Sequence, residues 1–187
     1  MSDLVRARLR IGLLLVVTVL IETTLGSDLR IAGVAPDLMI LVVICAGLTG
    51  GTLHGAFVGF WAGLLYDMFL VSTPVGLSAL TYCLIGAATG AMRTSVLQER
   101  RSLLPLAALV GTAIGVIFFV GAGDVLGQTQ LLGAGRAWLI RVIIVESAWN
   151  TVLALPVGYI YAWVARGSAG AERFGSPFRR TTAPIVK

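Results

Sequence analysis

Residues 38–66 read LMILVVICAGLTGGTLHGAFVGFWAGLLY, a run of 29 residues without a charge between Asp37 and Asp67. A single helix of this length would measure about 43 Å, well beyond the ~30 Å hydrocarbon core of a bilayer. The middle of the run, residues 47–55, reads GLTGGTLHG and is rich in residues that favour turns over helix. We therefore predict two short helices joined near Gly50–His54. They either cross the membrane as a tight hairpin or are partly re-entrant.

The composition of the whole chain indicates a membrane protein. Of its 187 residues, 57% are hydrophobic and only 12% are charged, against roughly 25% charged in an average soluble domain. The mean hydropathy is +0.93, although the net charge is +5 and the pI is near 9.9. The remaining polar residues are too few to cover so much apolar surface in water. This excludes a soluble enzyme and a soluble nucleic-acid binder, and it predicts an all-α, polytopic integral membrane protein.

Gaps between charged residues predict the other spans, because a charge at the bilayer centre costs at least about 2.5–3.5 kcal/mol. The six transmembrane helices are expected at about 10–26, 36–51, 55–70, 77–92, 103–121 and 137–164. Together they form one membrane domain, residues 1–166. Residues 167–187 are rich in Gly, Ser, Pro and Arg and are expected to form a disordered basic tail on the cytoplasmic side.

The distribution of basic residues favours six spans over five. With six spans and a cytoplasmic N-terminus, 11 of the 14 basic residues lie in cytoplasmic segments. A five-span chain in its better orientation keeps only nine of them there. Because positive charge concentrates on the cytoplasmic side of membrane proteins, we predict six spans with both termini in the cytoplasm.

Small residues recur at every fourth position in the third and fourth predicted spans. They are Gly55, Gly59, Gly63 and Asp67 in one span and Gly86 and Gly90 in the next. A step of four residues drifts by only about 40° around a helix, so each series forms one broad face. Such faces let helices approach closely in lipid. They serve either packing within the monomer, which we favour, or the binding of a partner helix.

Few ionisable or strongly polar side chains lie within the predicted spans. They are Glu22, Asp67, Arg141, Glu146 and Asn150. Because isolated charges in a membrane seek partners, we hypothesise that Asp67 pairs with Arg141 near the outer leaflet. Glu22 and Glu146 are alternative partners for Arg141. Glu146 and Asn150 are one helical turn apart and are expected to form a polar patch facing the bundle. Structural pairing explains this patch better than a proton or ion pathway.

No pattern in the chain predicts chemistry. Pro36 and Asp37 suit the first turn of a helix, where Asp complements the helix dipole, so capping explains both. His54 has no second His or suitably placed Cys, so we predict no metal site. There is no nucleophile–base pair, phosphate loop or dinucleotide fingerprint. We therefore expect a protein without catalytic residues or cofactors, which is not an enzyme.

Three segments of the chain carry a recognisable pattern. They read DLRIAGVAPDL at 28–38, GFWAGLLYD at 59–67 and TPVGLSALTY at 73–82, the last followed by Gly86-x3-Gly90. Together they resemble the MreD family of rod shape-determining proteins. The resemblance covers about residues 10–93. The positions that match the family signature are Pro36, Asp37, Gly59, Gly63, Asp67, Pro74, Gly76, Tyr82 and Gly86.

The resemblance implies a non-enzymatic member of the cell-elongation machinery in the bacterial inner membrane. Such proteins work with MreC, and the pair supports peptidoglycan synthesis by the RodA glycosyltransferase and its penicillin-binding transpeptidase. MreB filaments lie on the cytoplasmic side. The implied contacts are therefore MreC and membrane lipids, with no nucleic acid.

The family is also similar to the six-helix substrate-binding subunits of energy-coupling-factor vitamin transporters. A subunit of a small-molecule transporter is therefore the alternative function. Those subunits carry an Ala-x3-Ala face in their first helix, whereas residues 11–25 contain no alanine. An intramembrane enzyme, the other rival, is disfavoured by the lack of a nucleophile or metal constellation.

Overall fold

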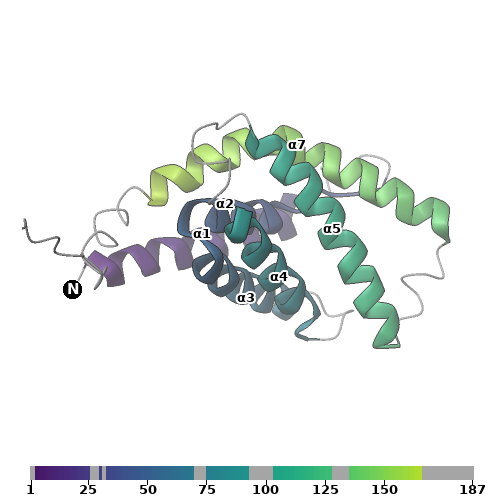
Figure 1. The fold of residues 1–187 in the computed structure, drawn as a ribbon, viewed down its shortest axis with the longest axis horizontal. Coiled ribbons are helices and arrows are strands. Elements are labelled where there is room, and N and C mark those ends of the chain that lie inside the picture. Colours follow the sequence, from purple (N-terminus) through teal and green to yellow (C-terminus); the bar gives the residue numbers. More distant parts are fainter. Residues whose placement is uncertain are drawn as a thin grey trace, which may run out of the picture.

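The computed structural model describes residues 3–25, 30, 33–69, 75–92, 103–127 and 135–165. These residues contain six helices: α1 (Asp3–Leu25), α2 (Leu38–Gly50), α3 (Thr52–Phe69), α4 (Leu77–Met92), α5 (Leu104–Val125) and α7 (Arg136–Ala165) (Figure 1). The predicted all-α fold is confirmed. Five of the described helices lie within about four residues of an expected span, whereas α1 begins at Asp3, before the span expected at 10–26, and so includes Arg6, Arg8 and Arg10. The predicted tail, 167–187, and Pro74 lie outside the described residues.

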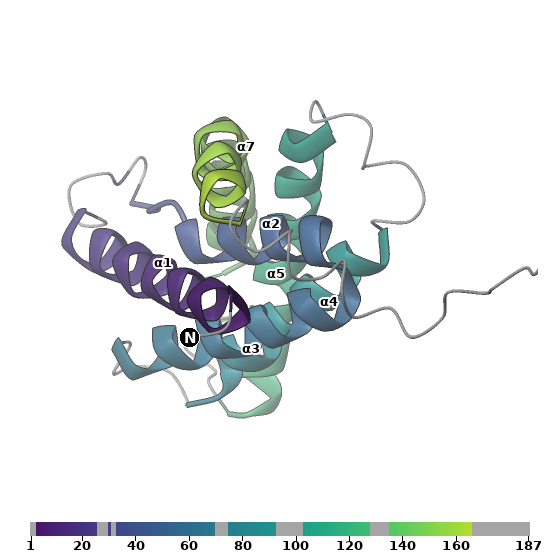
Figure 2. The ribbon, with the colours of Figure 1, turned by 90° about the vertical axis from the view of Figure 1, so that its left-hand side faces the viewer.

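Helix α2 forms the centre of the bundle. Nine consecutive residues, Met39 to Gly47, are buried. The helix contacts each of the other five described helices, which surround it in Figure 2. A helix that is apolar on all sides must be covered on all sides. The charge-free sequence of α2 therefore explains its central position.

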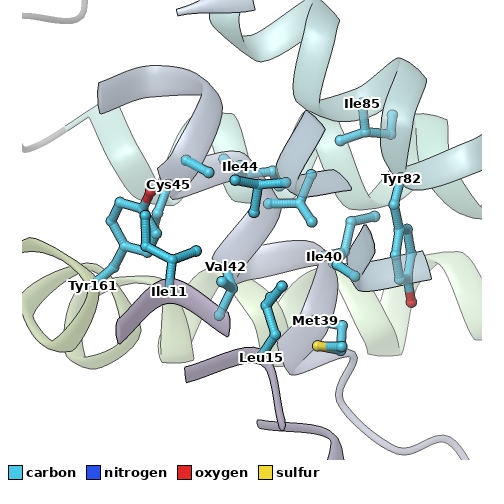
Figure 3. Close-up of a cluster of buried hydrophobic side chains, with 14 of the residues drawn as sticks. Ile11, Leu15, Met39, Ile40, Val42, Ile44, Cys45, Tyr82, Ile85 and Tyr161 are labelled. Atoms are coloured by element: carbon cyan, nitrogen blue, oxygen red, sulfur yellow. The ribbon is translucent and has the colours of Figure 1, made fainter. Parts of the chain in front are cut away.

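One buried apolar cluster connects α2 to its neighbours. In Figure 3, Ile11 of α1 and Tyr161 of α7 lie beside Cys45 near one end of α2. Tyr82 of α4 lies on the side of Ile40, near the other end. The cluster joins four helices through α2, so a cavity made at its centre would loosen several helix contacts at once.

The 29-residue charge-free run breaks at one glycine, within the predicted turn. Gly51 has φ +86° and ψ −177°, a backbone conformation that is open almost only to glycine. Its N–H donates to the carbonyl of Gly47 at 2.8 Å and closes α2. Helix α3 begins at the next residue, Thr52, so the predicted pair of short helices is confirmed.

Two described helices, α5 and α7, are long and apolar enough to cross a membrane. Helix α2 has 13 residues and α4 has 16, or about 20 and 24 Å, which is less than a ~30 Å core. Helix length thus supports fewer full spans than the six predicted. The exterior of the bundle is nevertheless apolar on every helix except the buried α2. Large exposed side chains include Leu13, Phe57, Trp61, Leu84, Ile117 and Val152.

Candidate functional site

The glycine face of α3 lies directly on the backbone of α4. Contacts advance by four residues along both helices in opposite directions, and a methyl group added at any of these glycines would meet backbone atoms of the other helix. The facing pairs are Gly55 with Gly86, Gly59 with Tyr82, Gly63 with Ser78, and Gly90 with Gly51. The series predicted from the sequence is therefore used within the monomer. It is closed to a partner helix, the alternative that the sequence left open.

Asp67 occupies the next step of the same face and caps α4 from the neighbouring helix. Its side chain is only 3% exposed. Oδ2 accepts hydrogen bonds from the N–H of Gly76 at 2.7 Å and of Ala79 at 3.4 Å, and Oδ1 accepts one from Ser78 at 3.2 Å. The first N–H groups of a helix lack partners within it, and its dipole favours a negative charge there. The Asp67 carboxylate accepts hydrogen bonds from these N–H groups and places a negative charge at the start of α4.

The hypothesised pair between Asp67 and Arg141 is wrong. Arg141 is exposed on α7, and within the described residues no ion pair joins it to Asp67, Glu22 or Glu146. The physical reason is that three backbone N–H donors already surround the Asp67 carboxylate, which needs no arginine to balance its burial.

Asp37 caps α2, as its position beside Pro36 predicted. Its Oδ1 accepts a hydrogen bond from the N–H of Ile40 at 2.8 Å. Its Oδ2 accepts a second one, from the hydroxyl of Tyr82 at 2.6 Å. Sequence reasoning missed this link between α2 and α4, because the two residues are 45 positions apart and no local pattern relates them. Asp37 thus fixes the start of α2 and also the rotation of α4.

A cavity of about 230 Å³ lies where α2 and α4 begin and α3 ends. Helices α5 and α7 spread apart toward this end and form its other walls (Figure 1). The apolar lining includes Ile40, Val116, Phe119, Trp138 and Val142. The polar lining consists of Asp37, Tyr66, Ser78, Thr81, Tyr82 and Glu146. Two carboxyl groups from distant parts of the chain therefore face one space.

The predicted polar patch of α7 is divided between two places. Glu146 lines the cavity, whereas Asn150 is fully buried and donates from Nδ2 to Thr112 Oγ1 of α5 at 3.0 Å. Glu22 of α1 does not line the cavity, but its electrostatic neighbours include Asp37, Tyr66 and Glu146. The acidic groups thus gather around the start of α2 instead of pairing with Arg141.

The opposite end of the bundle has a different polar contact. His54 Nε2 lies 3.3 Å from the hydroxyl of Tyr161, which joins the start of α3 to the last turns of α7. Within the described residues, no group of three or more His, Cys, Asp or Glu side chains is placed to hold a metal ion.

Comparison with known families gives one match. The family model described as rod shape-determining protein MreD matches residues 6–164. No curated protein and no solved structure matches the chain.

Proposed function

This chain belongs to the MreD family, whose members act in rod shape determination, and we propose that it is a non-enzymatic scaffold of the bacterial elongation machinery. The observation that carries this proposal is the family match, which covers residues 6–164 and so includes every described helix almost completely. In this role the protein binds MreC in the inner membrane. Through MreC it supports peptidoglycan synthesis by RodA and its transpeptidase, beside MreB filaments.

The proposed topology has six spans with both termini in the cytoplasm. In this topology the ends of α1, α3 and α5 and the starts of α2, α4 and α7 lie on the outer side. The residues that line the cavity come from those same ends, for example Asp37, Tyr66, Ser78 and Trp138. The contact between His54 and Tyr161 lies at the other end, on the proposed cytoplasmic side. The apolar exterior supports placement in a membrane, because exposed patches of this kind suit a lipid environment.

MreC has to bind to the lipid-facing exterior of the helix bundle. The close-packing faces of α3 and α4 are occupied by each other, and α2 is covered by its neighbours. What stays accessible to a partner helix is the apolar exterior of the remaining faces. The transporter alternative gains no support from the family match.

Photo-cross-linking in cells tests this proposal. A photoreactive amino acid replaces one exposed residue at a time on four helices: Leu13, Phe57, Leu84 and Ile117. We expect at least one of these positions to cross-link to MreC. Ala62, which is fully buried in α3, is the matched control and is expected to give no such product. Absence of MreC from the products of all exposed positions would refute MreC binding by these faces.

A further inference from the structure

We propose that the cavity at the start of α2 binds an organic ammonium ion, either a free small amine or the amine headgroup of a lipid. This site is independent of the scaffold role, because it uses side chains inside the bundle and none of the exterior residues discussed above.

The charge of the lining defines the class of ligand. Asp37 and Glu146 contribute two carboxyl groups, and Glu22, which is outside the lining, is an electrostatic neighbour of both. None of the described lining residues is Lys, Arg or His. Asp37 is already held by the N–H of Ile40 and the hydroxyl of Tyr82, whereas within the described residues no donor or cation pairs with the half-buried Glu146 carboxyl group. A positively charged occupant supplies the missing partner.

An unsatisfied hydroxyl gives a second, independent observation. Ser78 lines the cavity and is only 1% exposed, yet its Oγ has no hydrogen-bond partner. Buried polar atoms are nearly always hydrogen-bonded, so an unpaired hydroxyl on a residue of the cavity wall is available to a bound group. An ammonium group carries several N–H donors, and Ser78 Oγ and the two carboxyl groups are acceptors for them.

Size and aromatic lining favour an organic cation over a metal ion or a proton. Two carboxyl groups that merely share a proton need no space between them. The cavity of about 230 Å³ equals the volume of about eight waters at ~30 Å³ each, which is ample for a cation of a few heavy atoms. Tyr66, Phe119 and Trp138 place aromatic rings in its wall, and such rings attract ammonium groups through cation–π interactions.

Calorimetric titration of the full chain in phosphatidylglycerol nanodiscs tests the proposal, with ethanolamine as the probe. Ethylene glycol, which has the same size without the charge, is the ligand control. We expect saturable binding of ethanolamine and none of ethylene glycol. Glu146→Gln and Ser78→Ala are each expected to weaken binding about tenfold. The first replaces a carboxylate by a neutral amide and so removes its charge, and the second removes a hydrogen-bond acceptor for the ammonium group. Asp124→Asn on α5, outside the cavity lining, is the matched control and should bind as the wild type does.

Nanodiscs that contain phosphatidylethanolamine distinguish the two sources of the amine. If the lipid headgroup occupies the cavity, this lipid raises the unfolding temperature of the wild type but not of Glu146→Gln, and it competes with free ethanolamine. If a free amine is the ligand, the lipid has neither effect. Ser78→Ala is the smaller change and decides the matter if Glu146→Gln does not fold. The proposal is overturned if ethanolamine and the ethanolamine lipid both fail to act, if ethylene glycol binds equally well, or if Ser78→Ala keeps full affinity.

Discussion

Asp67 provides the sharpest test of how the bundle is held together. Replacing it with alanine removes the acceptor of three N–H groups at the start of α4, those of Gly76, Ser78 and Ala79. Loss of a helix cap costs about 1–2 kcal/mol, and loss of a charge at a partly buried helix end costs up to about 2 kcal/mol. We therefore expect Asp67→Ala to lower the free energy of unfolding by about 3 kcal/mol. Asp67→Asn keeps one side-chain oxygen acceptor and should lose about half as much.

The assay is reversible unfolding of the protein in mixed micelles with increasing sodium dodecyl sulfate, followed by circular dichroism. Asp124→Ala is the matched control, because Asp124 is a half-buried acid near the end of α5 whose carboxylate accepts no hydrogen bond from the described residues. Surface changes away from such contacts usually stay within about 0.5 kcal/mol, and we expect that result here. If Asp67→Ala is no more destabilising than Asp124→Ala, the capping role of Asp67 is refuted. If Arg141→Gln lowers the free energy of unfolding by as much as Asp67→Ala does, that result would favour the ion pair between Asp67 and Arg141 over the capping role.

Three further substitutions test single contacts by the same unfolding assay. Gly59→Ala should lower the free energy of unfolding by about 2–3 kcal/mol, because its new methyl group meets the backbone of Tyr82. Gly12→Ala is the control: its methyl group meets nothing within 4 Å, so it should be neutral or stabilising by up to about 1 kcal/mol. Equal effects of the two would show that α3 and α4 are not in backbone contact. Gly51→Ala should cost about 1–3 kcal/mol, since its φ of +86° strains any residue with a side chain, and an unchanged midpoint would argue against this turn. Tyr82→Phe should cost about 1–3 kcal/mol through the lost hydrogen bond to the Asp37 carboxylate, while Tyr159→Phe at an exposed position should cost almost nothing.

Much of the fold follows from charge and glycine spacing alone. Charge-free gaps predict the helices because ionisable groups avoid apolar surroundings, and the turn at Gly51 follows from a run too long for one helix. The four-residue series ending at Asp67 predicts the face that α3 presents to α4. These features depend on the period of one helix, which a single sequence records directly.

The partners of polar side chains were harder to predict. The four-residue series places Asp67 on the face that meets α4, but matching it by charge predicts the wrong partner, because that reasoning ignores backbone N–H groups as competitors for a carboxylate. Glu146 and Asn150 share one side of α7 over a single turn, yet one meets a cavity and the other meets Thr112. Which neighbour each reaches depends on where α5 diverges from α7, and no local pattern encodes that.

The cavity itself was not predictable from sequence. Its lining comes from the segment that precedes α2 and from five helices, and the carboxyl groups of Asp37 and Glu146 are more than 100 positions apart. The signal that points toward it is the presence of acidic residues such as Glu22 and Glu146 within apolar segments. Acidic residues in apolar segments are expected to have partners, but the sequence does not show that Asp37 and Glu146 line the same cavity.

Deletion of the gene from its own host is the measurement that tests the scaffold proposal most directly, with cell length and width recorded by microscopy. The proposed role in elongation predicts that the cells become wide and round. Rod shape should return when the wild-type chain is supplied in trans, and Asp124→Asn should restore it equally well. Cells that keep their rod shape and normal width without this protein would contradict the account.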